Sequence, residues 1–222
     1  PKFEILTAIG PCHLETFGTI ENVADTKFEL IRALPPDGRA VLNFDDKRIR
    51  ELAVTSPAPV ISYALEAGNA DFWAEDITFD AKGMHFTVVT KKGGKQPMRT
   101  LLLGKHNIYN ILAAVAVACE LGMKLDAIAR AVATVQPVPH RLVLKPTAGG
   151  ITIIDDAFNS NPVGAQTALE VLAAMPGGQK IIITPGMVEL GKAEYEENKK
   201  FAISCARSCD YVILVGKTHS KP

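Results

Sequence analysis

Two asparagines three residues apart, Asn107 and Asn110, carry amides whose paired donors and acceptors suit an adenine edge. They follow Gly104, where a predicted strand ends, and precede the apolar run 111–119. A helix over 107–121 would place both amides on one stripe with that run and would be buried nearly all round. The other members of the stripe are Ile111, Ala114, Ala118 and Leu121. The alternative is that both amides cap or buttress the first helical turn.

Lys27 interrupts the apolar stripe of a helix predicted over residues 20–34. The apolar members of the stripe are Ile20, Val23, Ala24, Phe28, Ile31 and Leu34. Either the Lys27 side chain extends along the apolar surface to solvent, or burial favours its neutral amine. A neutral amine reacts with carbon dioxide to give a carbamate, which is a carboxylate-like metal ligand.

His13 lies in the loop that follows the first predicted strand, over residues 3–9. Open α/β sheets place their ligand sites at the carboxyl ends of strands. An imidazole there could bind a divalent cation, and Glu15 could assist it. The alternative is an exposed loop histidine that binds nothing.

Two adjacent acids, Asp155 and Asp156, follow the predicted strand 151–154. They could bind a ribose hydroxyl, a metal or an ammonium group, and the helix start at Asn161 attracts phosphate or carboxylate. The alternative is a solvated turn in which Asn161 is the helix cap. Arg141 lies at a proline-rich predicted domain boundary, where it could reach a phosphate or form a surface ion pair.

The elements that must position these residues alternate in type. Strands are predicted over 3–9, 40–44 and 59–63, and helices over 20–34 and 45–53. Asp45 is the predicted N-cap of the second helix. Three β-rich runs, 72–79, 84–90 and 97–103, indicate an antiparallel insert with a hairpin turn at Lys92-Gly93-Gly94-Lys95.

The second part of the chain follows helices at 107–121 and 125–135. Pro137-Val138-Pro139 marks the predicted boundary between a domain over 1–139 and one over 140–222. Strands are predicted over 142–145, 151–154, 180–184 and 211–215, and helices over 163–175 and 193–208. This alternation predicts a parallel sheet.

Composition narrows the function classes. The 222 residues carry 24 basic and 24 acidic side chains, so the net charge of zero argues against nucleic acid or a membrane surface as the main partner. The four cysteines have no zinc-like spacing, which favours reduced thiols in the cytoplasm. Gly216-Lys217-Thr218 is not a P-loop, because Tyr211 stands where the pattern needs glycine.

Four motifs, in a fixed order, resemble the Mur ligase family. The first is His13-Leu14-Glu15-Thr16-Phe17-Gly18, with Lys27 fourteen residues after the histidine. The others are Gly104-Lys105-His106-Asn107-x-x-Asn110, Pro139-His140-Arg141 and Asp155-Asp156-Ala157-Phe158-Asn159-Ser160-Asn161-Pro162. A fifth, Gly186-Met187-Val188-Glu189-Leu190-Gly191, resembles a loop of the members that add a dipeptide. The resemblance spans essentially the whole chain.

The resemblance implies roles on the metal side and the nucleotide side of an ATP site. Lys27 matches the family's carbamylated lysine, which supports a second magnesium site, and His13 matches the histidine that binds that magnesium. Asn107 and Asn110 match the asparagines of the nucleotide site, with Asn110 on the adenine edge.

It also implies roles in the second domain. Arg141 matches a residue that reaches phosphate, and Asp156 one that reaches the ribose. Asn159 and Asn161 are expected to line the site of the incoming amino-acid substrate.

The implied fold is α/β: the later half of a central ATPase domain, with an α/β core and a small antiparallel sheet, then an incomplete Rossmann-like C-terminal domain. The family's N-terminal UDP-binding domain and P-loop half have no counterpart in the sequence, so both ends resemble cuts in a longer protein. Phe158 stands where the family has tyrosine. Thr184-Pro185 replaces glycine-aspartate before Gly186-Met187.

The implied activity is ATP-dependent, magnesium-assisted amide ligation that joins D-alanyl-D-alanine to a UDP-MurNAc-peptide. We expect a cytoplasmic monomer that neither binds nucleic acid nor inserts into a membrane, and no turnover by these residues alone. One alternative is a related ligase with another amine acceptor, of the diaminopimelate-adding or folylpolyglutamate type. Another is a non-catalytic nucleotide-binding module.

Overall fold

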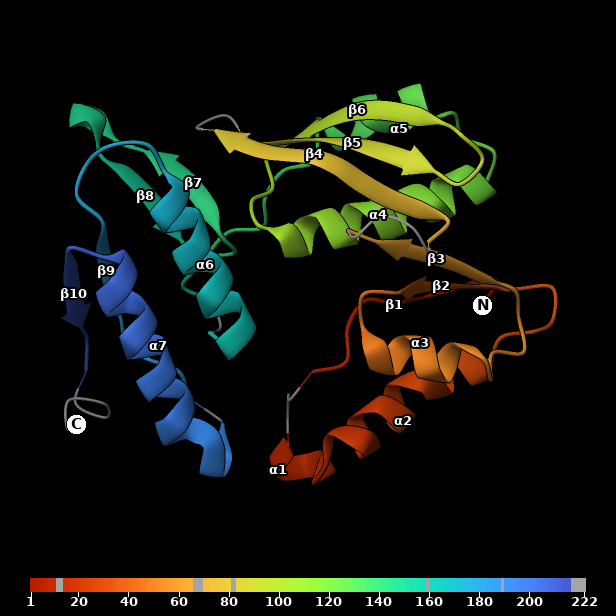
Figure 1. The fold of residues 1–222 in the computed structure, drawn as a ribbon, viewed down its shortest axis with the longest axis horizontal. Helices are drawn as coiled ribbons and strands as arrows, with labels where there is room; N and C mark the ends of the chain where they lie inside the picture. The colour runs from red at the N-terminus through yellow and green to blue at the C-terminus, as the bar shows by residue number, and fades with distance from the viewer. Residues whose placement is uncertain (11–13, 66–69, 81–82, 159, 189, 217–222) are drawn as a thin grey trace. The chain divides into compact units, whose positions relative to one another are not determined.

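The computed structural model describes residues 1–10, 14–65, 70–80, 83–158, 160–188 and 190–216. The chain folds into two compact units, Pro1–Gln136 and Pro137–Pro222 (Figure 1).

Unit 1 is built on one sheet with the strand order β1-β2-β3-β4-β5-β6. Its strands are β1 (Phe3–Leu6), β2 (Arg39–Asn43), β3 (Val60–Ala64), β4 (Phe72–Asp80), β5 (Gly83–Thr90) and β6 (Lys95–Thr100). β1, β2 and β3 are parallel, and β4 joins β3 in parallel through the pairs Tyr63↔Phe72 and Ala64↔Trp73. β4, β5 and β6 are antiparallel, which confirms the predicted insert. The insert continues the parallel sheet because β4 pairs with β3, so it is not a separate small sheet.

Helices cover both faces of the parallel strands. They are α1 (Leu14–Phe17), α2 (Ile20–Arg32), α3 (Lys47–Ala53), α4 (Lys105–Glu120) and α5 (Leu125–Val132). Figure 1 shows α4 on one face of β1–β3 and α2 and α3 on the other. The short α1 is absent from the predicted elements; α2, α4 and α5 form where the periodicity predicts them.

The core beneath α2 explains why this helix forms and how it is oriented. Phe28 and Ile31 of α2 are fully buried, and they pack with Leu42 of β2 and Ile49 of α3 in one cluster. Burying each such side chain contributes about 1.5–3 kcal/mol to folding. Because Val41, the neighbour of Leu42, is fully buried too, β2 is covered on both faces, as parallel strands require.

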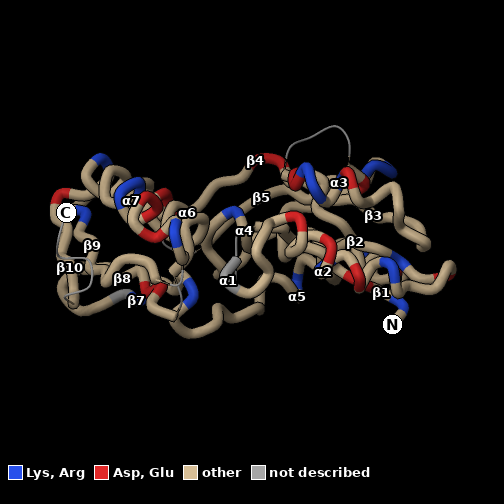
Figure 2. The backbone as a smooth tube through the Cα atoms, turned by 90° about the horizontal axis from the view of Figure 1, so that it is seen from below, with Lys and Arg blue, Asp and Glu red and all other residues tan. Residues whose placement is uncertain are grey.

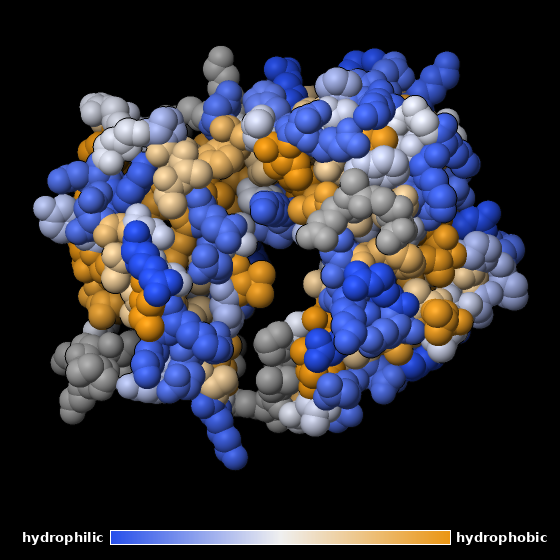
Figure 3. All heavy atoms as spheres, in the orientation of Figure 1, coloured by the Kyte–Doolittle hydropathy of each residue, from blue (hydrophilic) through white to orange (hydrophobic). Residues whose placement is uncertain are grey.

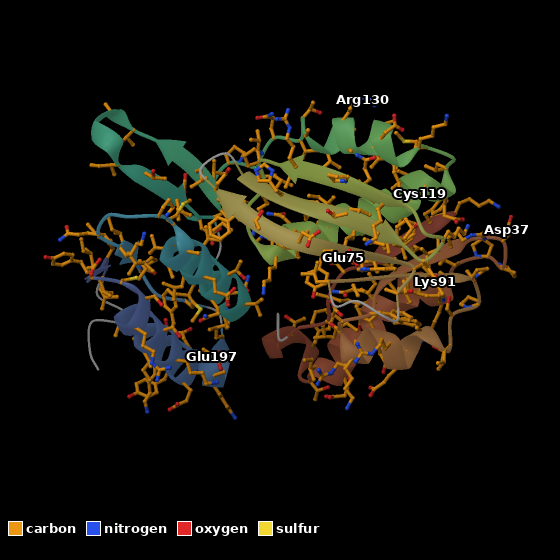
Figure 4. The ribbon with its side chains drawn as sticks, turned by 45° about the horizontal axis from the view of Figure 1, so that its top comes forward. Asp37, Glu75, Lys91, Cys119, Arg130 and Glu197 are labelled. Carbon is orange, nitrogen blue, oxygen red and sulfur yellow. The ribbon has the colours of Figure 1, made fainter. Side chains whose placement is uncertain are left out.

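Turn residues fix the antiparallel insert. The predicted hairpin turn is confirmed: Gly93 N donates to Thr90 O, and Thr90 N donates to Gly94 O, each at 2.8 Å. Gly83 begins β5 with φ of +123°, and a Cβ there would lie 2.0 Å from the Thr100 carbonyl oxygen. Glycine is therefore required at position 83. Glu75 on β4 (Figure 4) accepts hydrogen bonds at 2.9 Å from Trp73 Nε1 and from Lys95 Nζ on β6.

The turn that follows β2, residues 43–46, is named here the β2 turn. Asn43 is 6% exposed; its Nδ2 donates to Thr7 O at 2.9 Å, and its Oδ1 accepts from Asp45 N at 3.0 Å. The N-cap of α3 is Asp46, whose Oδ1 accepts from the first backbone N–H groups of the helix. The prediction of Asp45 as this cap is wrong, because α3 begins at Lys47 and the residue just before it, Asp46, has the extended cap backbone and accepts the cap hydrogen bonds.

Unit 2 contains two small sheets and two helices. The elements are β7 (Val143–Pro146), β8 (Thr152–Asp155), α6 (Pro162–Ala174), β9 (Ile181–Thr184), α7 (Glu194–Ser208) and β10 (Tyr211–Leu214), with 3-10 turns at Ala148–Gly150 and Gly191–Ala193. β9 and β10 are parallel, as predicted. The prediction that β7 and β8 belong to the same parallel sheet is wrong: they form an antiparallel pair of their own, since the five residues between them make a tight connection rather than a helical crossover.

Strands β9 and β10 of unit 2 expose apolar side chains in a chain whose charged residues are otherwise well mixed. Figure 2 shows Lys and Arg interspersed with Asp and Glu along the chain, in keeping with the zero net charge. Ile183 of β9 is 66% exposed and Leu214 of β10 is 55% exposed. Figure 3 shows hydrophobic residues at the surface around these two strands. Among the described residues, no helix has the length and apolar character needed to cross a bilayer.

Burial makes the described thiols poor nucleophiles. Cys205 is 1% exposed, and burial raises its pKa to about 11. Burial also raises the pKa of Cys119 and of Cys209, so all three thiols remain protonated at neutral pH. Cys12 lies outside the described residues.

Replacing the buried amide of Asn43 tests the β2 turn. We expect Asn43→Ala to lower the free energy of unfolding by about 2 kcal/mol, because the Thr7 carbonyl and the Asp45 N–H lose their partner in a buried setting. Urea unfolding of the whole chain measures the change. Asn22→Ala is the matched control, since its exposed Nδ2 donates to Phe17 O at 2.8 Å. Equal effects of the two substitutions would contradict the role of burial.

Candidate nucleotide and metal-side residues

Lys27 reaches from α2 to the end of the first strand. Its side chain is half-buried on the apolar face of the helix, and its Nζ donates to Ala8 O at 3.1 Å. The side chain is therefore directed toward the backbone just after β1. His13, at the end of the same connection, lies outside the described residues, as does the side chain of Glu15.

Asn107 and Asn110 lie at the start of α4 and are bonded to one another. Asn107 Nδ2 donates to Leu103 O at 2.7 Å, and Asn110 Nδ2 lies 3.4 Å from Asn107 Oδ1. The N-cap is Gly104, with φ of 87° and no side-chain cap hydrogen bond. Asn107 therefore buttresses the first turn, whereas Asn110 is exposed. Asn107 can therefore support the helix start while the amide of Asn110 stays accessible to a ligand.

The prediction that α4 is buried nearly all round is wrong. Ala114 is exposed and Leu121 is 66% exposed, although Ile108 and Leu112 are fully buried. The stripe predicted to be buried with the asparagines is mixed, because Ile111 is 5% exposed whereas Ala114 and Leu121 are exposed. The apolar run does not determine burial here, because alanine occurs both in the protein core and on the surface. Asn110 is thus available to a ligand without any burial cost.

Arg141 is stacked on an aromatic ring in unit 2. Its Cζ lies 4.2 Å from the centroid of the Phe158 ring. This distance is typical of a cation–π contact. The tyrosine that the family resemblance led us to expect at position 158 is replaced without loss of the ring face that Arg141 uses.

The backbone around Arg141 is strained and is held by its neighbours. His140 and Leu142 have φ of 63° and 51°, a left-handed conformation that costs a non-glycine residue about 1–2 kcal/mol. Asp156 Oδ1 accepts from Leu142 N at 3.0 Å, and Phe158 N donates to His140 O at 3.2 Å. Strain of this kind clusters at functional sites. The side chain predicted to bind ribose therefore also fixes the turn that presents Arg141.

Asp155 serves a different purpose from Asp156. Its side chain is 10% exposed, forms an ion pair with Lys145 and lies 2.9 Å from His140 Nδ1. Hydrogen bonding to Lys145 lowers the pKa of the Asp155 carboxyl, and the Ala157 N–H and His140 lower it further against the opposing effect of burial. Asp155 thus remains ionised and joins the Arg141 turn to β8.

Asn161 caps α6, the alternative that the sequence left open. Its Oδ1 accepts from Gly164 N at 2.9 Å, and its side chain is exposed. Asn159, the other predicted substrate residue, lies outside the described residues. The substrate role of both asparagines stays a prediction.

The loop after β9 is held by a residue that the sequence alone did not single out. Asn198 of α7 accepts from Met187 N and donates to Met187 O, each at 2.8 Å. Thr184 Oγ1 accepts from Gly186 N at 3.1 Å, so the departure at position 184 supplies a local turn contact. The one sequence signal for this role is the position of Asn198 in the middle of a polar helix. Glu189 lies outside the described residues.

The concave surfaces do not coincide with these residues. An open groove of about 590 Å³ between β5, β6 and α5 is lined in part by His85, Arg99 and Arg130, the last marked in Figure 4. A smaller one of about 170 Å³ lies between α6 and α7. The predicted site residues that the structure describes line neither groove. The described part of the chain holds no group of three or more His, Cys, Asp or Glu that could hold a metal ion. The candidate site is therefore defined by the types of its residues and not by a groove in the surface.

The chain belongs to the Mur ligase family. Residues 1–118 match the Mur ligase middle domain, and residues 140–222 match the glutamate ligase domain of Mur ligases. The chain is 34% identical over 220 residues to the UDP-N-acetylmuramoyl-tripeptide–D-alanyl-D-alanine ligase of Escherichia coli, covering 98% of this chain and 48% of that protein. It is 29% identical to the Bacillus subtilis ligase of the same name, covering 98% and 46%.

Solved structures agree in fold. MurF from Acinetobacter baumannii superposes with a TM-score of 0.85 at 28% identity, covering 98% of this chain and 47% of that one. MurF ligase from Thermotoga maritima in complex with ADP gives 0.84 at 25% identity, covering 96% and 48%. The chain thus spans about half the length of the relatives it matches.

The ionised state of Asp155 makes unit 2 sensitive to acid. Because its pKa is lowered on folding, its contribution to stability is present above the ordinary aspartate pKa, about 3.9, and is lost as pH falls through the folded value. We expect Asp155→Asn to lower the melting temperature near pH 7, with the difference from the parent shrinking below about pH 4. Thermal melts from pH 3 to 7 measure it. Asp126→Asn, which removes the exposed Arg130 pair, should change little; an Asp155 effect that is constant with pH would refute the assignment.

Proposed function

We propose that residues 1–222 form the middle and C-terminal part of an ATP-dependent ligase that joins D-alanyl-D-alanine to a UDP-MurNAc-peptide in peptidoglycan precursor synthesis. Similarity to the Escherichia coli ligase over 98% of the chain carries the proposal. The presence of all four motifs supports it. The proposal includes a cytoplasmic monomer that neither binds nucleic acid nor inserts into a membrane; the zero net charge supports the part that concerns nucleic acid.

The reaction has two steps. An oxygen of the peptide carboxylate attacks the γ-phosphorus of ATP, which releases ADP and leaves an acyl phosphate. The amine of the dipeptide then attacks the acyl carbon, forms the amide, loses a proton and releases inorganic phosphate. The protein must hold the nucleotide, the carboxylate and the amine in line and keep water from the acyl phosphate.

The nucleotide contacts are assigned from the resemblance to Mur ligases, to residues of unit 1 and of unit 2. Asn110, exposed at the start of α4, would bind the adenine edge, and Asn107 would hold Asn110 in place. Arg141 would contact phosphate with a guanidinium already oriented by Phe158. Asp156 would reach the ribose while it fixes the Arg141 turn. Asn159 and Asn161 would face the incoming amine.

Lys27 fits the metal side because its Nζ already lies against the segment that leads to His13. As a carbamate it would offer an anionic oxygen ligand, and His13 would offer an imidazole nitrogen. When bound, Mg²⁺ supplies neutralisation of charge between the γ-phosphate and the carboxylate. The hydrogen bond to Ala8 O orients the Lys27 amine, so the same contact would orient the modified group.

A panel of amines tests the proposed acceptor. We expect the full-length protein that contains this chain to form product with D-alanyl-D-alanine at a higher kcat/KM than with diaminopimelate or glutamate. ATP-dependent phosphate release with a UDP-MurNAc-tripeptide is the measurement. Residues 1–222 alone should give no product, since the sequence holds no P-loop to cradle the phosphates. Preference for another amine, or turnover by residues 1–222 alone, would count against the proposal.

Lys27→Ala tests the metal side. In the full-length protein we expect ligation to fall about 10²- to 10³-fold, as for loss of one group that stabilises transition-state charge. A short carboxylic acid such as acetate should restore part of the rate if a carbamate is what is lost. Lys47→Ala on α3, whose side chain is 80% exposed, is the matched control and should leave the rate unchanged. An unchanged rate in Lys27→Ala would refute the role.

A further inference from the structure

Side chains, rather than sheet hydrogen bonds, hold the three residues that follow β1. Asn43 Nδ2 binds Thr7 O at 2.9 Å, Lys27 Nζ binds Ala8 O at 3.1 Å, and Asp46 Oδ2 binds Ile9 N at 2.8 Å. Two of these three contacts come from the β2 turn. The backbone that leads toward His13 is therefore positioned by the β2 turn together with Lys27.

The same turn also binds the helix that carries the asparagines. Asp45 Oδ2 accepts from Tyr109 Oη at 2.7 Å and from Leu65 N at 2.6 Å. Tyr109 stands between Asn107 and Asn110 in the first turns of α4. Because the cap residue Gly104 offers no side chain to hold the helix start, this lateral contact constrains where the first turn lies.

A second tyrosine beside Tyr109 allows the effect of ring packing to be distinguished from that of the hydroxyl hydrogen bond. Tyr63 of β3 lies with its ring centroid 6.5 Å from that of Tyr109 and is fully buried. Its hydroxyl has no hydrogen-bond partner among the described residues. Both rings fill space between β3 and α4. The backbone carbonyl of Tyr63 accepts from Phe44 N of the β2 turn at 2.8 Å, but of the two hydroxyl groups it is that of Tyr109 that bonds to the β2 turn. A phenylalanine at either position would keep the packing.

We propose that Asp45 and Tyr109 are positioning residues that fix the asparagine pair of α4 relative to the β2 turn. The inference rests on the proposed function, since it assigns the pair to the nucleotide base. The β2 turn then connects two parts of the site: Asn43 and Asp46 hold the backbone on the Lys27 side, and Asp45 holds α4 on the base side. A displacement on the Lys27 side would therefore also shift the residues on the base side, and the reverse.

Tyr109→Phe in the full-length protein tests the inference. We expect the Kd for ADP, measured by calorimetry, and the KM for ATP to rise about 3- to 10-fold, the effect of one ordinary hydrogen bond, with a smaller change in kcat. Tyr63→Phe is the matched control and should leave ADP affinity unchanged, because it removes a hydroxyl without a described partner. Similar melting temperatures of the two variants would separate positioning from general destabilisation.

A double substitution makes the test specific to the pair. If Asp45 acts on nucleotide binding through Tyr109, then Asp45→Asn with Tyr109→Phe should weaken ADP binding no more than Asp45→Asn alone. Additive losses, or equal ADP affinity in Tyr109→Phe and Tyr63→Phe, would overturn the inference. ADP binding that responds to Tyr109→Phe in a protein without ligase activity would support the inference while rejecting the proposed function. A parent that binds no ADP would reject both.

Discussion

The hydrogen bonds of the buried Asn43 amide are the constraint on which unit 1 depends. One amide joins the carbonyl after β1 to the backbone N–H of Asp45 after β2, so it fixes the carboxyl ends of two neighbouring strands against each other. An amide can do this because it donates and accepts within a few ångströms, which neither an aliphatic nor a carboxylate side chain can. The helix cap at Asp46 and the contact of Asp45 with α4 both follow from the turn that Asn43 shapes.

Unit 2 solves a related problem with strain and charge. The left-handed residues on either side of Arg141 cost free energy, and Asp156 and the Phe158 backbone hold them in place. In both units, groups suited to ligands also bind the backbone of their own chain. Such double use is economical in a small domain, because a side chain fixed by one bond loses less entropy when it makes a second.

Much of this arrangement could be predicted from sequence. Periodicity located α2, the hairpin insert and the strands, but the break at Lys27 left open whether this side chain extends to solvent or is held in a site. Burial around α4 could not be predicted, since a run rich in alanine fits an exposed and a buried face alike. The antiparallel pairing of β7 with β8 could not be predicted from alternation alone, because it follows from the short connection between these two strands. The β2 turn was missed because its partners, from Thr7 to Tyr109, are distant in sequence and meet only in the folded chain.

The exposed β-branched and aromatic side chains of β9 and β10 have a consequence for handling the protein. Among the described residues β10 pairs with β9 alone, so its other edge has no described strand partner, and Ile183 of β9 and Tyr211 and Leu214 of β10 are exposed. Short, apolar, uncharged strands of this kind are templates for pairing between molecules. The β10 edge is therefore the place, among the described residues, where two copies of this polypeptide would pair at high protein concentration. A lysine introduced on the outward face of that strand is a direct route to better solubility.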